Sequence, residues 1–164
     1  MQKQFRVELE KEQLIFSAAH FITFADVDGN VICEQLHGHN YRVCCEVVGP
    51  LNEHGYVVDF IALRNTLAKL VDQLDHQVLV ATQHPTIAVA VDDREVILTF
   101  EDRRWVFPRT DCVLLPIANT TAELIASYLC DSLIDSGILP ENLSEVVLKV
   151  DENEGQWGEC RVSL

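Results

Sequence analysis

Apolar and polar residues alternate along four stretches of the chain, and this pattern predicts four β-strands. Residues 5–16 and 40–48 alternate and carry several β-branched and aromatic side chains. Residues 144–150 and 157–164 form a second pair near the end of the sequence. Residues 21–32 contain aspartate, glycine and asparagine, which is typical of a loop. The first two strands are therefore expected to pair as an antiparallel hairpin around this long loop.

A different period, close to that of an α-helix, predicts two helices. In residues 59–71 the leucine and valine side chains fall on one apolar face, and Asp59 is suited to the N-cap. Residues 121–136 form the second helix, with Thr120 or Thr121 as its cap. Each helix thus has one apolar face available for packing on a sheet.

The order of these elements predicts the fold class. Residues 87–107, between the helices, read as short strands that form a protruding β-ribbon. The chain then runs as two strands, a helix, the ribbon, a helix and two strands. Such runs predict an α+β fold with both helices on one face of an antiparallel sheet. Residues 1–164 are expected to form one domain, with the ribbon as an insertion at about 86–110. Association of several copies is one way to cover the open sheet edges.

The charge balance narrows the range of partners. The chain has 12 basic and 26 acidic residues, a formal net charge of −14. This argues against nucleic acid or an anionic membrane as a general partner. No N-terminal signal segment and no apolar run of membrane-spanning length occur, so a cytoplasmic protein is expected. The six cysteines show no CxxC spacing and are expected to be buried thiols rather than disulfides.

Three histidines suggest a metal site. His37 and His39 flank Gly38, and on an extended strand alternate side chains face the same way. His20 ends the segment FSAAH, which reads as a strand. Three neutral imidazoles with one open position are a ligand set of catalytic zinc. The alternative is three unrelated polar residues in a long hairpin, and the spacing favours zinc.

Other chemical groups occur near these histidines or at element ends, and each has two interpretations. Cys33 is either a buried apolar residue or, beside a dication, a thiol of lowered pKa that acts as base or nucleophile. Glu34 is either a solvated carboxylate or a general base. Asp75 and His76 are either a polar helix terminus or an acid/base pair. Glu152 is either a turn residue or a carboxylate that accepts paired hydrogen bonds from a pterin or guanine edge.

Several motifs follow one another along the chain: FSAAH, CEQLHGHN, VVDF, LDH, TTAE and DENEGQWGEC. Together they resemble the 6-pyruvoyl-tetrahydropterin synthase family, which includes the bacterial 6-carboxy-tetrahydropterin synthases of queuosine biosynthesis. The resemblance implies a tunnelling (T-fold) subunit, a four-stranded antiparallel sheet with two helices on one face. It implies a homohexamer, built as a dimer of trimers. It also implies zinc bound by His20, His37 and His39.

The resemblance further implies a lyase reaction and the residues that carry it. The family substrate is 7,8-dihydroneopterin triphosphate, which loses triphosphate. The product is 6-carboxy-5,6,7,8-tetrahydropterin, or 6-pyruvoyl-tetrahydropterin in another branch. Cys33 matches the proton-abstracting thiolate, with Asp75 and His76 as its acid/base partners. The product branch stays open at this point.

The resemblance also implies pterin contacts, and one departure from the family pattern bears on the product. Thr121 and Glu123 lie in the segment that matches the lining of the pterin pocket, and Glu152 matches the glutamate that anchors the ring. Glu34 directly follows the cysteine, which in the family accompanies a folate branch that forms 6-hydroxymethyl-dihydropterin. A non-catalytic member that binds zinc or pterin is a further alternative. Candidate triphosphate contacts are Arg42, Lys69, Arg103, Arg104 and Arg109.

Overall fold

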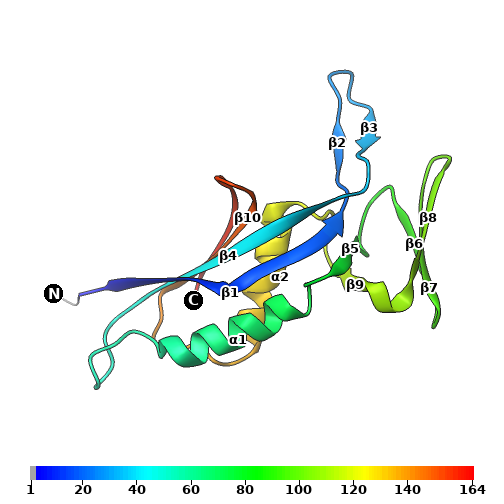
Figure 1. Ribbon diagram of the computed structural model, residues 1–164. Coiled ribbons are helices and arrows are strands. Elements are labelled where there is room, and N and C mark those ends of the chain that lie inside the picture. The colour runs from blue at the N-terminus through cyan, green and yellow to red at the C-terminus, as the bar shows by residue number, and fades with distance from the viewer. Residues whose placement is uncertain (1–2) are drawn as a thin grey trace.

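The structure, a computed structural model, describes residues 3–164 and has the predicted α+β architecture (Figure 1). Three sheets are present in this part of the chain: a six-stranded sheet, a two-stranded hairpin and a three-stranded ribbon. The elements are β1 Phe5–His20, β2 Thr23–Ala25, β3 Val31–Cys33, β4 His37–Gly49, α1 Phe60–Asp72, β5 Gln77–Ala81, β6 Ala88–Val91, β7 Glu95–Phe100, β8 Arg103–Pro108, the short 3-10 helix Arg109–Asp111, β9 Cys112–Leu115, α2 Ala122–Asp135, β10 Glu145–Asn153 and β11 Gln156–Ser163.

The large sheet has the strand order β11-β10-β4-β1-β5-β9. Its first four strands are antiparallel and correspond to the four predicted strands. The other two, β5 and β9, run parallel to β1 and extend the sheet beyond the expected four strands. They were not predicted, because each has only four or five residues and lacks clear alternation.

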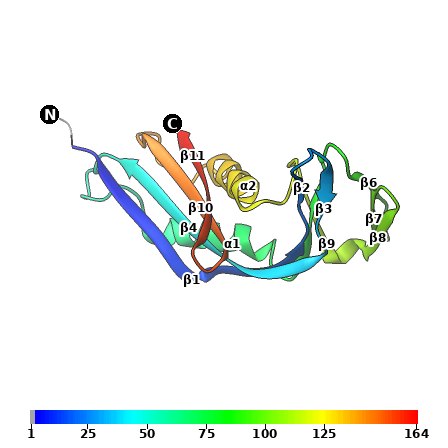
Figure 2. The same cartoon turned by 90° about the horizontal axis from the view of Figure 1, so that it is seen from above.

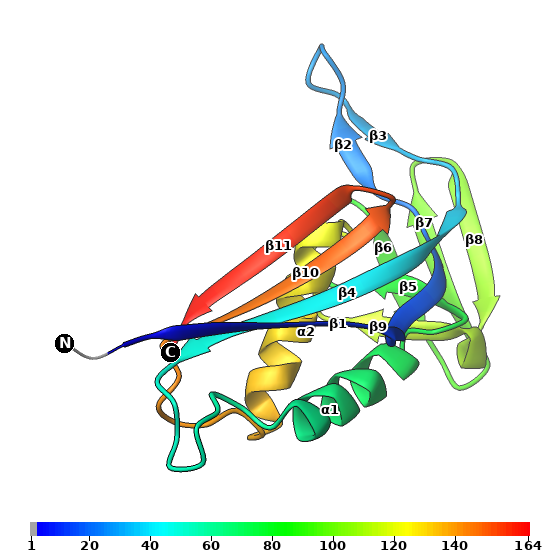
Figure 3. The ribbon, with the colours of Figure 1, turned by 60° about the vertical axis from the view of Figure 1, so that its left-hand side comes forward.

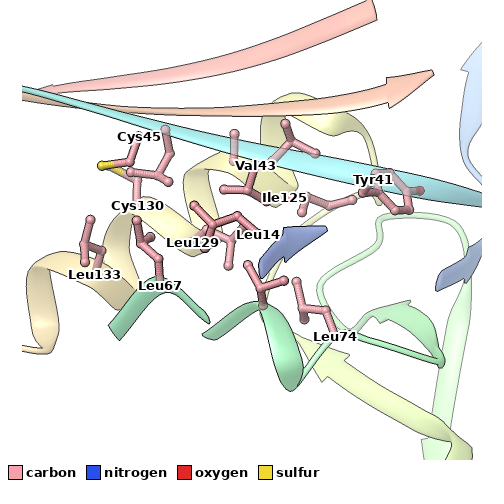
Figure 4. Packing of buried hydrophobic residues seen from close by; sticks show 14 of the residues in the cluster. Leu14, Tyr41, Val43, Cys45, Leu67, Leu74, Ile125, Leu129, Cys130 and Leu133 are labelled. Atoms are coloured by element: carbon pink, nitrogen blue, oxygen red, sulfur yellow. The ribbon is translucent and has the colours of Figure 1, made fainter. Parts of the chain in front are cut away.

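Helices α1 and α2 pack on one face of the long strands, as expected (Figures 1 and 3). Asp59 caps α1 by accepting from the backbone N–H groups of Ile61 and Ala62, and Thr121 caps α2. Figure 4 shows leucines of both helices packed against β4. Leu67, Leu129, Leu133 and Val43 are completely buried, and burying such a side chain contributes about 1.5–3 kcal/mol. The core therefore lies between the helices and the sheet.

Residues 21–32 differ from the expected loop, because they contain the β2–β3 hairpin. The Asp26 side chain accepts hydrogen bonds from the backbone N–H groups of Asp28 and Asn30. Gly29 has a φ of +83°, which a glycine adopts without strain. The turn residues that indicated a loop thus form only the tip of a hairpin.

The expected β-ribbon is confirmed and consists of β6, β7 and β8. It lies beside the β2–β3 hairpin at one end of the molecule, and Figure 2 shows it far from the start of β1. A second apolar cluster joins the ribbon to the sheet and includes Phe21, Cys33, Val96 and Leu98. This contact places the ribbon against the segment that leads into β4. Among the residues described, no helix is long and apolar enough to cross a membrane.

Candidate metal centre and active site

The pairing of β1 with β4 brings the three predicted histidines together. His20 stands directly opposite His37, and Ala18 stands opposite His39. Directly opposed residues project to the same face of a sheet, and so do residues two apart on one strand. The ring centroid of His20 lies 4.7 Å from that of His37 and 5.2 Å from that of His39. The two rings on β4 are 4.7 Å apart.

In His20 and His37, a contact with a backbone carbonyl group determines which ring nitrogen carries the proton and which has a free lone pair. Nδ1 of His20 lies 2.9 Å from the carbonyl oxygen of Thr120, and Nδ1 of His37 lies 2.8 Å from that of Gln35. A carbonyl oxygen only accepts, so in both rings Nδ1 carries the proton. The lone pair is then on Nε2, as in histidines that bind metals through this atom.

The Nε2 atoms converge on a carboxylate. Oε1 of Glu152 lies 2.9 Å from Nε2 of His20 and 3.3 Å from Nε2 of His39. Both of these nitrogens are buried without a hydrogen bond to any residue of the described chain. One ligand atom from each of the three histidines and from Glu152 lies within 4.8 Å of the others. Orphaned buried nitrogens around a carboxylate fit a divalent cation, which would satisfy them all.

Burial also sets the charge of this cluster. The pKa of His20 is lowered to about 4, mainly by burial and also by the two neighbouring imidazoles, although the bond to the Thr120 carbonyl opposes this shift. His20 is therefore neutral at pH 7, as a metal ligand must be. Burial raises the pKa of Glu152, while the positive forms of His39 and His37 lower it. The cluster thus contains a neutral His20 beside the Glu152 carboxylate.

The N-terminus of α2 lies against β11 near this cluster. A Cβ atom on Gly158 would come within 2.5 Å of the backbone nitrogen of Glu123, so only glycine permits this approach. Thr121 is the N-cap, and its hydroxyl accepts from the N–H of Leu124 at 3.4 Å. The charge of Glu123 contributes to the raised pKa of Glu152. The segment expected to line the pterin pocket is therefore close to the expected ring anchor.

The structure places Cys33 and Glu34, which lie shortly before the His-Gly-His motif, in different surroundings. Cys33 is buried in the second apolar cluster, and burial raises the pKa of its thiol although Arg103 opposes this shift. Glu34 instead extends toward the histidines, with Oε2 4.0 Å from Nε2 of His37. A buried thiol of raised pKa is a weak base and nucleophile. Of the pair, Glu34 is the residue placed beside the histidine cluster.

Asp75 and His76 form the expected pair but lie outside the histidine cluster. Nδ1 of His76 is 2.8 Å from Oδ2 of Asp75. Oδ1 of Asp75 accepts from the backbone N–H of Ser17 at 2.7 Å, and this bond contributes most to the lowered pKa of Asp75. The His76 side chain is 82% exposed.

A groove of about 510 Å³ lies beside this pair. Its lining includes Ser17, Ala19, Asn40 and His76. On β1, Ser17 and Ala19 alternate with the residues that face the helices, so they project to the opposite face of the sheet. Among the described residues no hydrogen bond or ion pair joins Asp75 or His76 to the three histidines, although His39 also lines this groove.

Three of the five candidate triphosphate contacts are engaged within the chain. Nε of Arg42 donates to Asp151 at 3.0 Å, and Arg109 donates to the carbonyl oxygen of Cys112 at 3.1 Å. Arg103 donates to two backbone carbonyl groups beside the metal ligands. The other two basic residues stay candidates.

Some residues that shape the site were not predicted. Thr120 and Gln35 hold two histidine rings through backbone carbonyl groups, which leave no side-chain signature in a sequence. Thr120 was one of the two candidate helix caps, and this was the only signal pointing to it. Arg103 contacts residues about seventy positions earlier in the chain, so no local pattern revealed its role.

Comparison with known proteins agrees with this geometry. The family model described as 6-pyruvoyl tetrahydropterin synthase matches residues 8–162. The chain belongs to this family. A Pyrococcus abyssi protein provisionally named 6-carboxy-5,6,7,8-tetrahydropterin synthase is 31% identical, over 91% of this chain and 87% of its own length. The 6-carboxy-5,6,7,8-tetrahydropterin synthase of Aquifex aeolicus is 30% identical, over 66% of this chain and 64% of its own length.

Solved structures of the family superpose closely. The Plasmodium vivax 6-pyruvoyltetrahydropterin synthase gives a TM-score of 0.89 at 28% identity, covering 99% of this chain and 100% of that one. A variant of that enzyme with a catalytic glutamate replaced by alanine gives 0.89 at 26% identity, with the same coverage. The T-fold expected from the sequence is thereby confirmed.

Proposed function

We propose that this protein is a zinc-dependent lyase that acts on 7,8-dihydroneopterin triphosphate and releases triphosphate. The observation that carries the proposal is the pair of buried, unbonded Nε2 atoms of His20 and His39 beside the Glu152 carboxylate. The names of the related proteins support a tetrahydropterin as the product. The first candidate product is 6-carboxy-5,6,7,8-tetrahydropterin, with 6-pyruvoyl-tetrahydropterin as the other synthase-type outcome.

His20, His37 and His39 would hold the zinc ion. Bound there, zinc would act as a Lewis acid that makes C–H bonds beside coordinated substrate oxygens more acidic. Glu152 accepts paired hydrogen bonds from the amidine-like edge of the pterin ring. Thr121 and Glu123 lie at the start of α2, which packs against Gly158 near Glu152. These residues together orient the substrate side chain over the metal ligands.

A second candidate product follows from the position of Glu34. Its carboxylate lies beside His37, whereas the thiol of Cys33 is buried and has a raised pKa. Glu34 is therefore the better placed general base in this structure. The Plasmodium vivax enzyme is described as having a catalytic glutamate, which supports such a role. Proton abstraction by Glu34 favours the folate-branch product, 6-hydroxymethyl-dihydropterin.

Asp75 and His76 act on the site of a neighbouring copy. Within the described chain no hydrogen bond or ion pair links them to the three histidines, and the His76 side chain is largely exposed beside a groove. In a ring with head-to-tail interfaces one face of a subunit meets a different face of its neighbour. A homohexamer, the assembly expected from the family resemblance, would bring the pair to the pterin site of the next subunit. There His76, held by Asp75, moves a proton to or from the substrate.

Product analysis tests the reaction. Zinc-loaded protein is incubated with 7,8-dihydroneopterin triphosphate, and the pterins are identified by mass spectrometry. We expect Glu34→Gln to lower turnover on the order of 10²-fold, because it removes a general base. Cys33→Ala should remove the 6-carboxy product and spare 6-hydroxymethyl-dihydropterin. Unchanged substrate with fully zinc-loaded wild-type protein would contradict the lyase and leave a non-catalytic binding protein.

A further inference from the structure

The β-ribbon makes a direct contact with the segment that carries Cys33 and Glu34. Nη1 of Arg103, at the start of β8, donates to the carbonyl oxygen of Cys33 at 2.7 Å. Nη2 of the same side chain donates to the carbonyl oxygen of Glu34 at 3.0 Å. Two donors of one planar guanidinium thus hold two consecutive peptide groups.

Aromatic rings fix the guanidinium itself. The Cζ atom of Arg103 lies 4.5 Å from the ring centroid of Trp105, two residues along the same strand. Trp105 stacks in turn on Phe21, with centroids 4.6 Å apart and an interplanar angle of 21°. Phe21 follows the metal-ligand candidate His20 directly in the sequence. The ribbon, the guanidinium and the histidine strand therefore form one continuous contact.

Holding both carbonyl groups determines the direction of the two side chains. In an extended strand consecutive carbonyl groups point in opposite directions, so two that accept from one guanidinium mark a bend where β3 ends at Cys33. Fixing this bend fixes the directions of both side chains. With the carbonyl groups of Cys33 and Glu34 bound to Arg103, the thiol enters the apolar cluster and the carboxylate faces His37. The backbone N–H of Glu34 is also held, by the carbonyl oxygen of Ile22 at 3.0 Å.

We propose that Arg103 is a positioning residue that keeps Cys33 buried and Glu34 at the histidine cluster, and so selects the residue that performs the proton transfer. The ribbon then has a function: it carries this guanidinium to the active-site segment. Without the two hydrogen bonds, the segment can turn and present the thiol to the site. The selection of product rests on the function proposed above, whereas the placement of Cys33 does not.

The test compares three variants of the full-length, zinc-loaded protein. Arg103→Met keeps a long side chain against Trp105 but has no donor, and Arg103→Lys keeps the charge but lacks the planar fork. Arg94→Met is the matched control, because it removes an exposed arginine from the turn of the same ribbon. Zinc content and thermal unfolding are measured for all three.

The first readout is the rate at which iodoacetamide alkylates Cys33, followed by mass spectrometry of its peptide. We expect an increase of about tenfold or more in Arg103→Met, because charge-assisted hydrogen bonds of this kind are among the stronger ones. Arg103→Lys should give a smaller increase, and Arg94→Met none. An alkylation rate in folded Arg103→Met equal to that of the wild type would overturn the proposal. So would loss of zinc and early unfolding in both Arg103 variants, since the residue would then support the fold in general.

The second readout is turnover. Arg103→Met should lower kcat with little change in KM, and should shift the product from 6-hydroxymethyl-dihydropterin toward 6-carboxy-tetrahydropterin. An unchanged product ratio and kcat would contradict the role in selection. If the wild type forms neither product, the proposed lyase function fails, and the alkylation rates still decide whether Arg103 places Cys33.

Discussion

The two faces of the β1–β4 pair differ at the end where the histidines lie. On the face toward the helices, His20 is completely buried and neutral, and its Nε2 atom points into the candidate metal centre. On the other face, His76 is 82% exposed and bonded to Asp75 beside an open groove. Successive side chains of β1, such as those of Ser17 and Ala18, project to opposite faces of the sheet. No hydrogen bond or ion pair links the three histidines to the Asp75–His76 pair within the described chain, and the proposed homohexamer would bring the pair of one copy to the histidines of the next.

Removing a ligand from the helix-facing side should have the largest effect. We expect His37→Ala to lose zinc and to lower turnover on the order of 10³-fold, because the metal supplies several kcal/mol of transition-state stabilisation. Metal analysis and pterin product assays measure the two effects. His54→Ala is the control, since His54 lies in an exposed turn. Stoichiometric zinc in the His37→Ala protein would contradict the ligand set.

The opposite face is tested by mixing inactive chains. His76→Ala alone should lower turnover on the order of 10²-fold, as expected for loss of an acid/base group. Subunits of His37→Ala and His76→Ala, unfolded and refolded together, should recover activity in about a quarter of the sites, because each site needs two intact halves from random neighbours. Assays of the mixture against each variant refolded alone measure this recovery. No recovery in mixed hexamers would show that one chain supplies both halves.

The same two faces show how much of the site the sequence predicts. His20, His37 and His39 were found because alternation along strands is local, and an antiparallel pairing of β1 and β4 follows from the order of elements. The separation of Asp75 and His76 from them was not predicted. It depends on how the chain leaves α1 and enters β5, and a helix pattern does not encode that direction.

Long-range contacts explain the remaining differences. Cys33 and Glu34 are neighbours in the sequence, and their opposite placement depends on Arg103 from a distant ribbon. The short strands β5 and β9 form because they complete a sheet that already exists, and they have little intrinsic strand pattern. The fold class and the convergence of the three histidines are thus readable from local periodicity, whereas the extra strands of the sheet and the placement of Cys33 and Glu34 are set by tertiary contacts.

The two faces should also respond differently to acid. In metal-free protein the folded-state pKa of His20 is about 4, against 6.5 for an unperturbed histidine. Between these values the unfolded chain binds a proton that the folded chain does not, so the free energy of unfolding falls as the pH decreases. Protonation of His20 thus lowers the free energy of unfolding by about 3 kcal/mol, an effect that is absent above pH 6.5 and complete below pH 4.

Urea unfolding of metal-free protein at several pH values measures this contribution. His20→Gln should flatten the pH dependence by that amount. His54→Gln, which removes a histidine from an exposed turn, is the control. Equal pH dependence in wild type and His20→Gln would contradict a neutral buried His20.

The smallest expected effects come from removing the N-caps of the two helices that cover the same face of the sheet. Thr121→Ala removes the cap of α2, and Asp59→Ala removes the cap of α1, whose start lies away from the histidines. Each loss should lower the free energy of unfolding by about 1 kcal/mol, because unsatisfied N–H groups return to the helix end. Only Thr121→Ala should also raise KM for the pterin substrate, since the start of α2 is held by Gly158 beside Glu152. Denaturant titrations give the stability change and steady-state assays give KM. A similar rise in KM for both variants would mean that α2 contributes to the site only through overall stability.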